Sequence, residues 1–170
     1  MSMIQKFQSK SGVTLLELMI TVVIIGLASA MAVPQLARTY RRLQFRAEVK
    51  DMTSSLKLAR SMAITTKSQY GVYFDTGKRT VTLFKDKVNL TSFDFASGDS
   101  VMRVDTLPSQ FTYLGTDIGN NAVLFLPNGT AGYTGGGNVY SIAASSEVVG
   151  IQATNVLAST GRVHTQYWYY

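Results

Sequence analysis

Residues 11–34 read SGVTLLELMITVVIIGLASAMAVP, an apolar run that contains a single charged residue, Glu17. The segment from Val13 to Val33 would form a helix about 31 Å long at 1.5 Å per residue, close to the roughly 30 Å hydrocarbon core of a bilayer. A carboxylate inside such a run is expensive unless it is paired or neutralised. The stretch therefore predicts a membrane-length helix in which Glu17 requires a partner.

A secretory signal peptide is the alternative interpretation of this stretch. Lys6 and Lys10 supply a basic leader, and Ala28-Ser29-Ala30 resembles a small-residue cleavage site, so the mature chain would begin near Met31. Two observations argue against it. Glu17 has no use in a signal peptide, and the helical pattern continues beyond the cleavage site.

The helical pattern continues from the apolar run into an amphipathic segment. Apolar residues in this segment recur mostly at three- and four-residue steps, which predicts one apolar face. This predicted stripe comprises Leu36, Tyr40, Leu43, Ala47, Met52, Leu56, Ala59 and Ala63. Pro34, at the junction, is expected to bend the helix or remove a hydrogen bond. We predict one helix over residues 13–66, apolar all round at 13–33 and amphipathic at 34–66.

After Ser68 the pattern changes to short alternating strands. QYGVYFD and RTVTLFKD flank Thr76-Gly77-Lys78 and predict a hairpin. Further strand candidates are VNLTSFDF, SVMRVDTL, FTYLG, AVLFLP, NVYSIAA, EVVGIQAT and GRVHTQYW, and turns are predicted at Ser97-Gly98-Asp99, Pro127-Asn128-Gly129 and Gly135-Gly136-Gly137-Asn138. The predicted fold class is α+β, a long helix packed on a small, mostly antiparallel β domain at residues 67–170. An all-β sandwich fused to a stalk is the alternative.

Composition excludes several kinds of site. The 170 residues include no cysteine and one histidine, His164. Disulfides, thiol catalysis and thiolate metal sites are therefore excluded, as are histidine-cluster metal sites and a Ser-His-Asp triad built on any other position. The motifs GxxxxGK[ST], GxGxxG and HExxH are also missing. We expect no enzymatic activity, no cofactor and no metal. The net charge of +6 fits an anionic partner or a solvated surface equally well.

The segment Gly12-Val13-Thr14-Leu15-Leu16-Glu17, after a basic leader and before the apolar run, resembles the class III signal of type IV pilins and type II secretion pseudopilins. Val13 replaces the usual aromatic residue or Met. The resemblance implies that residues 1–12 are a leader, which a prepilin peptidase removes after Gly12 before it N-methylates Val13. It also implies that Glu17 pairs with the α-amino group of Val13 on a neighbouring pilin and so sets register during assembly.

The same resemblance implies a bacterial inner-membrane protein with one membrane pass and a periplasmic C-terminal domain, which then enters a pilus or pseudopilus. Charge counting alone predicts the opposite orientation. The arginines after the apolar run, Arg38, Arg41, Arg42 and Arg46, outnumber the two leader lysines. We prefer the orientation that the processing motif implies, because that motif is the more specific signal.

The C-terminal half carries a narrower resemblance. Residues 122–130, AVLFLPNGT, followed by a strand pair and Gly161-Arg162-Val163, resemble the globular domain of the FimT/GspH group of minor pilins and pseudopilins. We therefore expect a minor type IV pilin that takes part in, and primes, pilus assembly. A type II secretion pseudopilin is the alternative within the group, and a periplasmic protein or enzyme with an ordinary signal peptide is the alternative outside it.

Some members of this group bind DNA through a Gly-Arg-x-Arg motif, and DNA is a candidate partner here. His164 stands where the second Arg would be, which weakens phosphate binding near neutral pH. Arg162, His164 and Arg103 are the candidate DNA contacts, with the aromatic residues 167–170 available for base stacking. The alternative is that Arg162 is a solvated strand residue and that the aromatic tail packs on the sheet or on a neighbouring subunit.

Overall fold

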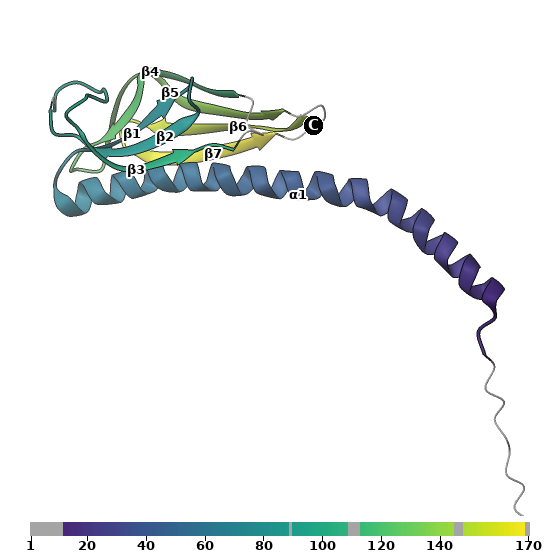
Figure 1. Ribbon diagram of the computed structural model, residues 1–170. Coiled ribbons are helices and arrows are strands. Elements are labelled where there is room, and N and C mark those ends of the chain that lie inside the picture. Colours follow the sequence, from purple (N-terminus) through teal and green to yellow (C-terminus); the bar gives the residue numbers. More distant parts are fainter. Residues whose placement is uncertain (1–11, 89, 109–112, 145–147, 169–170) are drawn as a thin grey trace, which may run out of the picture. The chain divides into compact units, whose positions relative to one another are not determined.

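The computed structural model describes residues 12–88, 90–108, 113–144 and 148–168. It contains one long helix followed by strands (Figure 1). The elements are α1 (Leu15–Thr66), β1 (Tyr70–Asp75), β2 (Thr80–Lys85), β3 (Ser100–Thr106), β4 (Tyr113–Phe125), β5 (Ala131–Ala144), β6 (Val148–Leu157) and β7 (Arg162–Trp168). The chain divides after Tyr40 into two compact units, which we describe separately.

The first unit is the N-terminal part of α1. Thr14 begins the helix as its N-cap: its side-chain oxygen accepts a hydrogen bond from the Glu17 amide at 3.2 Å, and its carbonyl accepts one from Leu18 at 3.1 Å. The carboxylate of Glu17 lies in the first turn, where the helix dipole favours negative charge. The helix continues through Pro34, which has no N–H to donate to the preceding turn.

The second unit is one seven-stranded sheet packed on α1 from Arg41 onward, so the predicted α+β class is confirmed. The strand order is β3-β2-β1-β4-β5-β6-β7, and every neighbouring pair is antiparallel. β3 and β7 are therefore the two edge strands. Because the strands form a single sheet against a helix, the sandwich alternative is wrong.

The predicted hairpin is confirmed as β1 and β2. Asp75 at the end of β1 accepts hydrogen bonds through Oδ1 from the amides of Gly77 at 3.0 Å and Lys78 at 2.8 Å, so its carboxylate shapes the turn. The Pro127-Asn128-Gly129 turn, which joins β4 to β5, is also confirmed. The amide of Gly129 donates to the carbonyl of Leu126 at 2.8 Å, and Gly129 adopts a φ of +84°, a conformation that favours glycine.

The core lies between the helix and the inner face of the sheet. From α1 it takes Phe45, Val49, Met52, Leu56, Ala59 and Ala63, and from the strands it includes Val72, Phe74, Val81, Leu114, Val123, Phe125, Val139 and Val156. The helical members follow one another at alternating steps of four and three residues, which keeps them on one side of the helix. Burial of a side chain the size of Phe45 stabilises the fold by about 1.5–3 kcal/mol.

The predicted apolar stripe was correct from Met52 onward and wrong before it. Leu43 is 56% exposed and Ala47 is exposed, whereas Phe45 and Val49 are each only 1% exposed. Leu36 and Tyr40, in the first unit, are exposed as well. The predicted stripe steps five residues from Ala47 to Met52, which rotates the face by about 140° at 3.6 residues per turn. The series that begins at Phe45 avoids this step.

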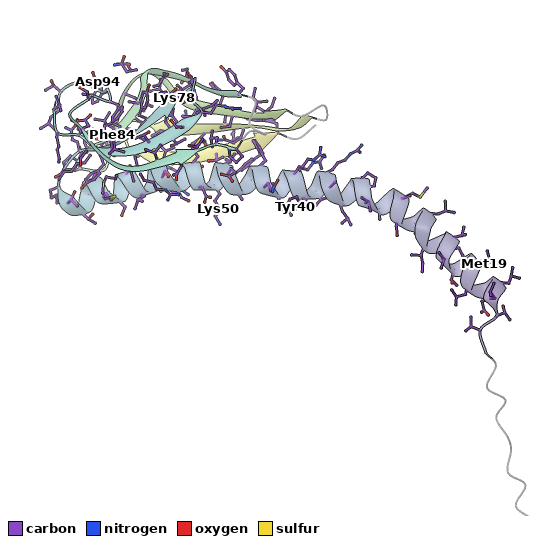
Figure 2. All side chains as sticks on the ribbon, viewed as in Figure 1. Met19, Tyr40, Lys50, Lys78, Phe84 and Asp94 are labelled. Atoms are coloured by element: carbon purple, nitrogen blue, oxygen red, sulfur yellow. The ribbon has the colours of Figure 1, made fainter. Side chains whose placement is uncertain are left out.

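The strand predicted at VNLTSFDF is wrong for the residues that the structure describes there, which form turns and bends. Its alternating Phe residues instead cover the outer face of the sheet. The ring centroid of Phe95 lies 5.1 Å from that of Tyr73 and 4.8 Å from that of Phe84. Phe84 is labelled in Figure 2. Phe93 packs on the same small cluster. The alternating pattern therefore arises from two loop residues, Phe93 and Phe95, that pack on the sheet, and not from a strand.

The glycine run predicted as a turn lies inside β5. The register between β4 and β5 shifts here, so the glycines form an irregularity within the ladder. Gly135 and Gly137 adopt φ values of +93° and +74°. The carboxylate of Asp117 stabilises this irregularity by accepting two hydrogen bonds from Asn138. The backbone amide of Asn138 donates one at 2.6 Å, and its side-chain Nδ2 donates the other at 2.7 Å.

Candidate functional site

The N-terminal motif combines an accessible glycine, a cap and a carboxylate. Gly12 and Val13 precede the helix, and a Cβ added at Gly12 would meet no atom within 4 Å. Val13 is 71% exposed, and the side chain of Glu17 is exposed in the first helical turn. The remainder of the predicted leader, residues 1–11, lies outside the described residues. Among the described residues, no atom crowds the α-carbon of Gly12.

The helix that follows exposes apolar side chains on every side. Between Leu15 at 78% and Met31 at 82%, nearly every large apolar side chain is more than half exposed. Among the described residues, α1 is a helix long and apolar enough to cross a membrane. A surface of this extent marks a site of contact with lipid or with other apolar helices.

The second candidate site is a pair of adjoining grooves between α1 and the edge strand β7. One groove, of about 460 Å³, is lined by Lys57, Arg60, Thr160, Gly161, Arg162 and Val163. The other, of about 300 Å³, is lined by Lys50, Thr53, Lys57, Val163, His164, Thr165 and Tyr167. The two grooves share Lys57 and Val163. None of the lining residues is acidic, so the surface is basic along its length.

Arg60 has a structural role within this surface. Its Nε donates to the carbonyl oxygen of Gly129 at 3.0 Å, and its Nη2 donates to the carbonyl oxygen of Thr160 at 2.9 Å. The guanidinium group therefore connects the helix to the turn before β5 and to the turn before β7. The cations that remain directed to solvent are Lys50, Lys57 and Arg162, whose side chains are exposed. Lys50 is labelled in Figure 2.

The structure separates the predicted DNA contacts. Arg162 and His164 lie on β7, where they join the two lysines of α1. Arg103 lies on β3, at the opposite edge of the sheet, and its Nε pairs with Asp105 Oδ1 at 2.7 Å. Sequence reasoning missed Lys50 and Lys57, although their seven-residue spacing places them on one side of a helix.

The side of α1 that faces β3 is acidic. Glu48 and Asp51 lie on the helix and Asp105 lies on β3. Partial burial raises the pKa of Glu48 above its usual value, and the charges of Asp51 and Asp105 raise it further. The two flanks of the helix thus differ in charge, with carboxylates toward β3 and cations toward β7.

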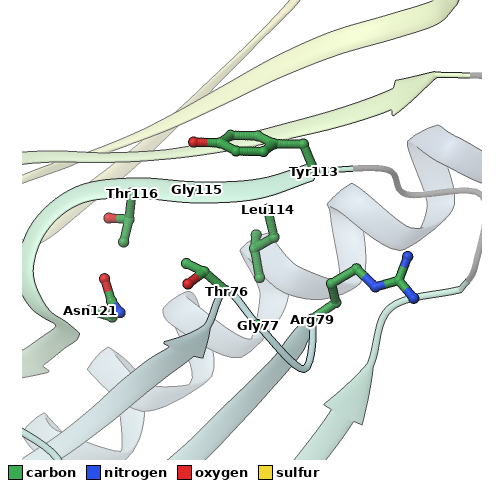
Figure 3. A pocket seen from close by; sticks show the side chains of 8 residues that line it. All are labelled: Thr76, Gly77, Arg79, Tyr113, Leu114, Gly115, Thr116 and Asn121. Carbon is green, nitrogen blue, oxygen red and sulfur yellow. The ribbon is translucent and has the colours of Figure 1, made fainter.

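A third cavity, of about 600 Å³, lies where β4 separates from β1 (Figure 3). The two strands pair only from Tyr70 to Tyr73 of β1, so the first half of β4 moves away from the β1–β2 turn. The lining residues are Thr76, Gly77, Arg79, Tyr113, Leu114, Gly115, Thr116 and Asn121. They include no carboxylate or histidine for acid–base chemistry. Among the described residues, no group of three or more His, Cys, Asp or Glu side chains lies close enough to hold a metal ion.

Two family models match the chain. Residues 8–33 match the prokaryotic N-terminal methylation motif, and residues 48–157 match type II transport protein GspH. The second match covers well over half of the chain, including α1 from Glu48 onward and strands β1 to β6. No curated protein sequence matches the chain.

Two solved structures share the fold. The minor pseudopilin EpsH from the type 2 secretion system of Vibrio cholerae has a TM-score of 0.54 and 16% identity, over 71% of this chain and 94% of that one. The type IV minor pilin FimU of Pseudomonas aeruginosa has a TM-score of 0.51 and 15% identity, over 74% of this chain and 90% of that one. At these identities the likeness concerns the fold.

Proposed function

The chain belongs to the GspH family of pilin-like structural subunits, and on this premise we propose that it is a minor type IV pilin that primes pilus assembly. The observation that carries the proposal is the coincidence of the N-terminal methylation motif with an exposed apolar helix that begins at Leu15, two residues after Val13. That motif implies processing by prepilin peptidase and assembly with other pilins. A pseudopilin of a type II secretion system is the alternative.

In the proposed processing, the peptidase removes residues 1–12 and methylates the new terminus at Val13. The mature chain then consists of the helix over 13–66, with 13–33 in the inner membrane, and the β-rich domain over 67–170. The sheet domain is proposed to lie in the periplasm. An apolar helix of this length supports membrane anchoring before assembly.

Assembly gives Glu17 its proposed role. When apolar helices pack together, the dielectric constant around them falls and an unpaired carboxylate becomes costly. Cleavage creates an α-amino group on Val13 whose ordinary pKa is about 7.7–8.0, so it is largely protonated at neutral pH. Pairing of this amine with Glu17 of a neighbouring subunit satisfies both charges. Register is selected because only one axial offset brings the two groups together.

The proposal is tested on the full chain in its own host. Intact-mass and N-terminal peptide analysis should show a chain that begins at an N-methylated Val13. A chain that begins near Met31 would eliminate the pilin interpretation. Sheared surface filaments should contain the processed chain, whereas its recovery only with secretion-system components would support the pseudopilin alternative.

Glu17→Gln should leave cleavage intact and reduce recovery of the chain in filaments. Thr21→Val is the matched control, because Thr21 is also exposed on the first turns of α1 and its hydroxyl donates to the carbonyl of Leu18 within the same helix at 2.8 Å. If Glu17→Gln and Thr21→Val assemble equally well, the role assigned to Glu17 is wrong.

DNA binding during natural transformation is a second candidate function. It is favoured by the paired basic grooves, where Arg162 and His164 adjoin two helix lysines and Tyr167. The full chain in detergent should then bind duplex DNA with an affinity that falls steeply with salt, and Arg162→Ala should weaken binding. Arg103→Ala is the control, because Arg103 lies at the opposite edge of the sheet. A lack of binding at low salt would exclude this function.

A further inference from the structure

The cavity beside β4 is formed by the course of the backbone. The pairing of β1 with β4 ends at Tyr73 and Ala122, and the first half of β4 pairs with β5 alone. Asn120 and Asn121 adopt φ values of +59° and +53°, a left-handed conformation that asparagine tolerates better than most residues. This pair redirects β4 away from β1. The resulting volume of about 600 Å³ lies within the roughly 300–1,000 Å³ that is typical of ligand sites.

The walls of this cavity present polar groups that the chain itself does not use. Thr76, Tyr113 and Asn121 line it, and their side chains form no hydrogen bond among the residues that the structure describes. Thr116 differs, because its hydroxyl donates to the carbonyl oxygen of Asn138 at 2.8 Å. Two hydroxyls and an amide can each donate and accept hydrogen bonds. They suit a ligand that carries several hydroxyl groups.

Tyr113 provides a flat aromatic surface at the mouth of the cavity. A Cβ added at Gly115 would clash with the Tyr113 ring, so the ring lies against this glycine, along β4 (Figure 3). Tyr113 is nevertheless 52% exposed, so one face of the ring rests on the strand and the other is open. The C–H groups on one face of a sugar are apolar, and stacking them on an open ring buries apolar area on both partners.

The aromatic surface continues across the outer face of the sheet. Tyr113 and Tyr140 each neighbour a core residue along their strand, so they point away from α1. Trp168 shares this face, because the register aligns it through β6 with the residue two positions after Tyr140. We call these three exposed residues the aromatic face. It spans three strand spacings, about 14 Å. In the part of the sheet that the structure describes, the two rows that hold these rings contain no charged side chain.

The chain covers another part of the outer face with its own aromatic rings. Phe95 packs on Tyr73 and Phe84, and a Cβ added at Gly132 would clash with the ring of Phe93. Both phenylalanines come from the segment between β2 and β3. The aromatic face has no such cover among the described residues, although it adjoins the cavity. An exposed surface of this composition marks a binding site.

Arg79 gives the cavity its charge. It is half-buried, and it is the one charged residue among those that line the cavity in the described part of the chain. Figure 3 shows its side chain at the end of the cavity away from Asn121. A guanidinium group can hold a carboxylate through two parallel hydrogen bonds. A sugar that carries a carboxylate therefore matches the cavity better than a neutral sugar does.

We propose that the cavity and the aromatic face together bind an acidic oligosaccharide. One sugar occupies the cavity, where Tyr113 stacks on its ring, Thr76 and Asn121 bond its hydroxyls, and Arg79 pairs with its carboxylate. Further sugars extend across the aromatic face. A peptide strand added to the open edge of β4 is the alternative, but strand addition makes no use of rings on the outer face. The inference goes beyond the proposed function, because neither the N-terminal motif nor the basic grooves take part.

Titration calorimetry of the full chain tests the site, in a detergent without a sugar headgroup such as lauryldimethylamine oxide. The acidic probe is hexagalacturonate, the neutral probe is chitohexaose, and polyglutamate controls for charge alone. Hexagalacturonate should bind saturably, and chitohexaose should bind about tenfold more weakly. Monomeric galacturonate should also bind more weakly than the hexamer, because it does not reach the aromatic face. Polyglutamate should not displace the hexamer.

Substitutions separate the stacking from the charge. Tyr113→Leu should weaken binding of both saccharides about tenfold, which corresponds to 1.4 kcal/mol, whereas Tyr113→Phe should retain most of it. Asn121→Gly keeps a residue that accepts positive φ and should also weaken both. Arg79→Gln should abolish the preference for the acidic probe. Lys78→Gln is its matched control and should change nothing, because Lys78 lies on the same turn but does not line the cavity.

Several outcomes would overturn the proposal. They are a lack of saturable binding of hexagalacturonate, equal effects of Arg79→Gln and Lys78→Gln, and unchanged binding by Tyr113→Leu. A peptide of alternating Val and Thr that binds where hexagalacturonate does not would assign the cleft to strand addition instead. Displacement of the saccharide by duplex DNA, lost in Arg162→Ala, would place it in the basic grooves. Because the N-terminus of the mature chain decides the proposed function separately, either conclusion can fail alone.

Discussion

Arg60 of α1 donates a hydrogen bond from Nε to the carbonyl oxygen of Gly129, and the two atoms lie 3.0 Å apart. The same guanidinium group reaches Thr160, so one side chain of the helix holds the turns that precede β5 and β7. The position of β7, and with it Arg162 and His164, therefore depends on a contact made across the domain. Arg60 lines the basic surface, but its main role is to position the strand that carries Arg162 and His164.

Replacement of Arg60 by Ala should lower the free energy of unfolding by about 2 kcal/mol, because two hydrogen bonds from a charged donor are lost from a partly exposed site. Chemical unfolding of the full chain in detergent, followed by fluorescence of Trp168, the sole tryptophan, would measure this loss. Lys57→Ala is the control and should change stability by less than about 0.5 kcal/mol. Equal effects of the two substitutions would contradict the role given to Arg60.

Gly161→Ala should lower the free energy of unfolding by about 3 kcal/mol, since it adds backbone strain and a steric clash. Gly161 adopts a φ of +62°, and an added Cβ would clash with the carbonyl oxygen of Gly129. Gly77→Ala is the matched control, because its Cβ would meet only the Asp75 side chain at 3.5 Å. The same unfolding measurement compares the two variants. A smaller loss of unfolding free energy for Gly161→Ala than for Gly77→Ala would contradict the requirement for glycine at position 161.

Phe45→Ala should lower the free energy of unfolding by about 3–5 kcal/mol, because it leaves a cavity between the helix and the sheet. Leu43→Ala, two residues away on an exposed face, should change it by less than about 0.5 kcal/mol. The pair tests which face of the helix meets the sheet. If Leu43→Ala lowered the free energy of unfolding strongly and Phe45→Ala lowered it little, the helix face expected from the sequence would be the buried one.

Glu48→Gln should raise the free energy of unfolding at pH 7 by up to about 1 kcal/mol, as for other partly exposed charges. The pKa of Glu48 is raised in the folded chain, so its ionised form is penalised there and not in the unfolded chain. This penalty is fully present above the folded pKa and disappears as the pH falls below the unfolded value of about 4.3. Urea unfolding of both proteins at pH 7 and pH 4 should therefore show a gain at pH 7 that shrinks at pH 4. A gain that grows on acidification would contradict the assignment.

Local patterns predicted much of the fold because neighbouring residues decide it. The three-to-four-residue spacing beyond Met52 predicted a helix face, and Thr76-Gly77 marked a turn that the Asp75 carboxylate stabilises by local hydrogen bonds. Four exposed residues of the predicted stripe made that prediction wrong before Met52, because an apolar side chain on a helix can face a partner molecule as well as its own core. They are Leu36, Tyr40, Leu43 and Ala47. Only the position of the sheet distinguishes these two cases.

One candidate site could be predicted from the sequence, and the other is assembled only by tertiary packing. The motif from Gly12 to Glu17 is contiguous, so the sequence alone placed its parts together: a glycine, the valine that we propose becomes the new terminus, and a carboxylate in the first turn of an apolar helix. The basic grooves join α1 to a strand about 100 residues later, and only tertiary packing placed Lys57 beside Arg162 and moved Arg103 to the far edge. The physical reason is that charge acts through space, whereas periodicity along the chain reports only which residues share one element.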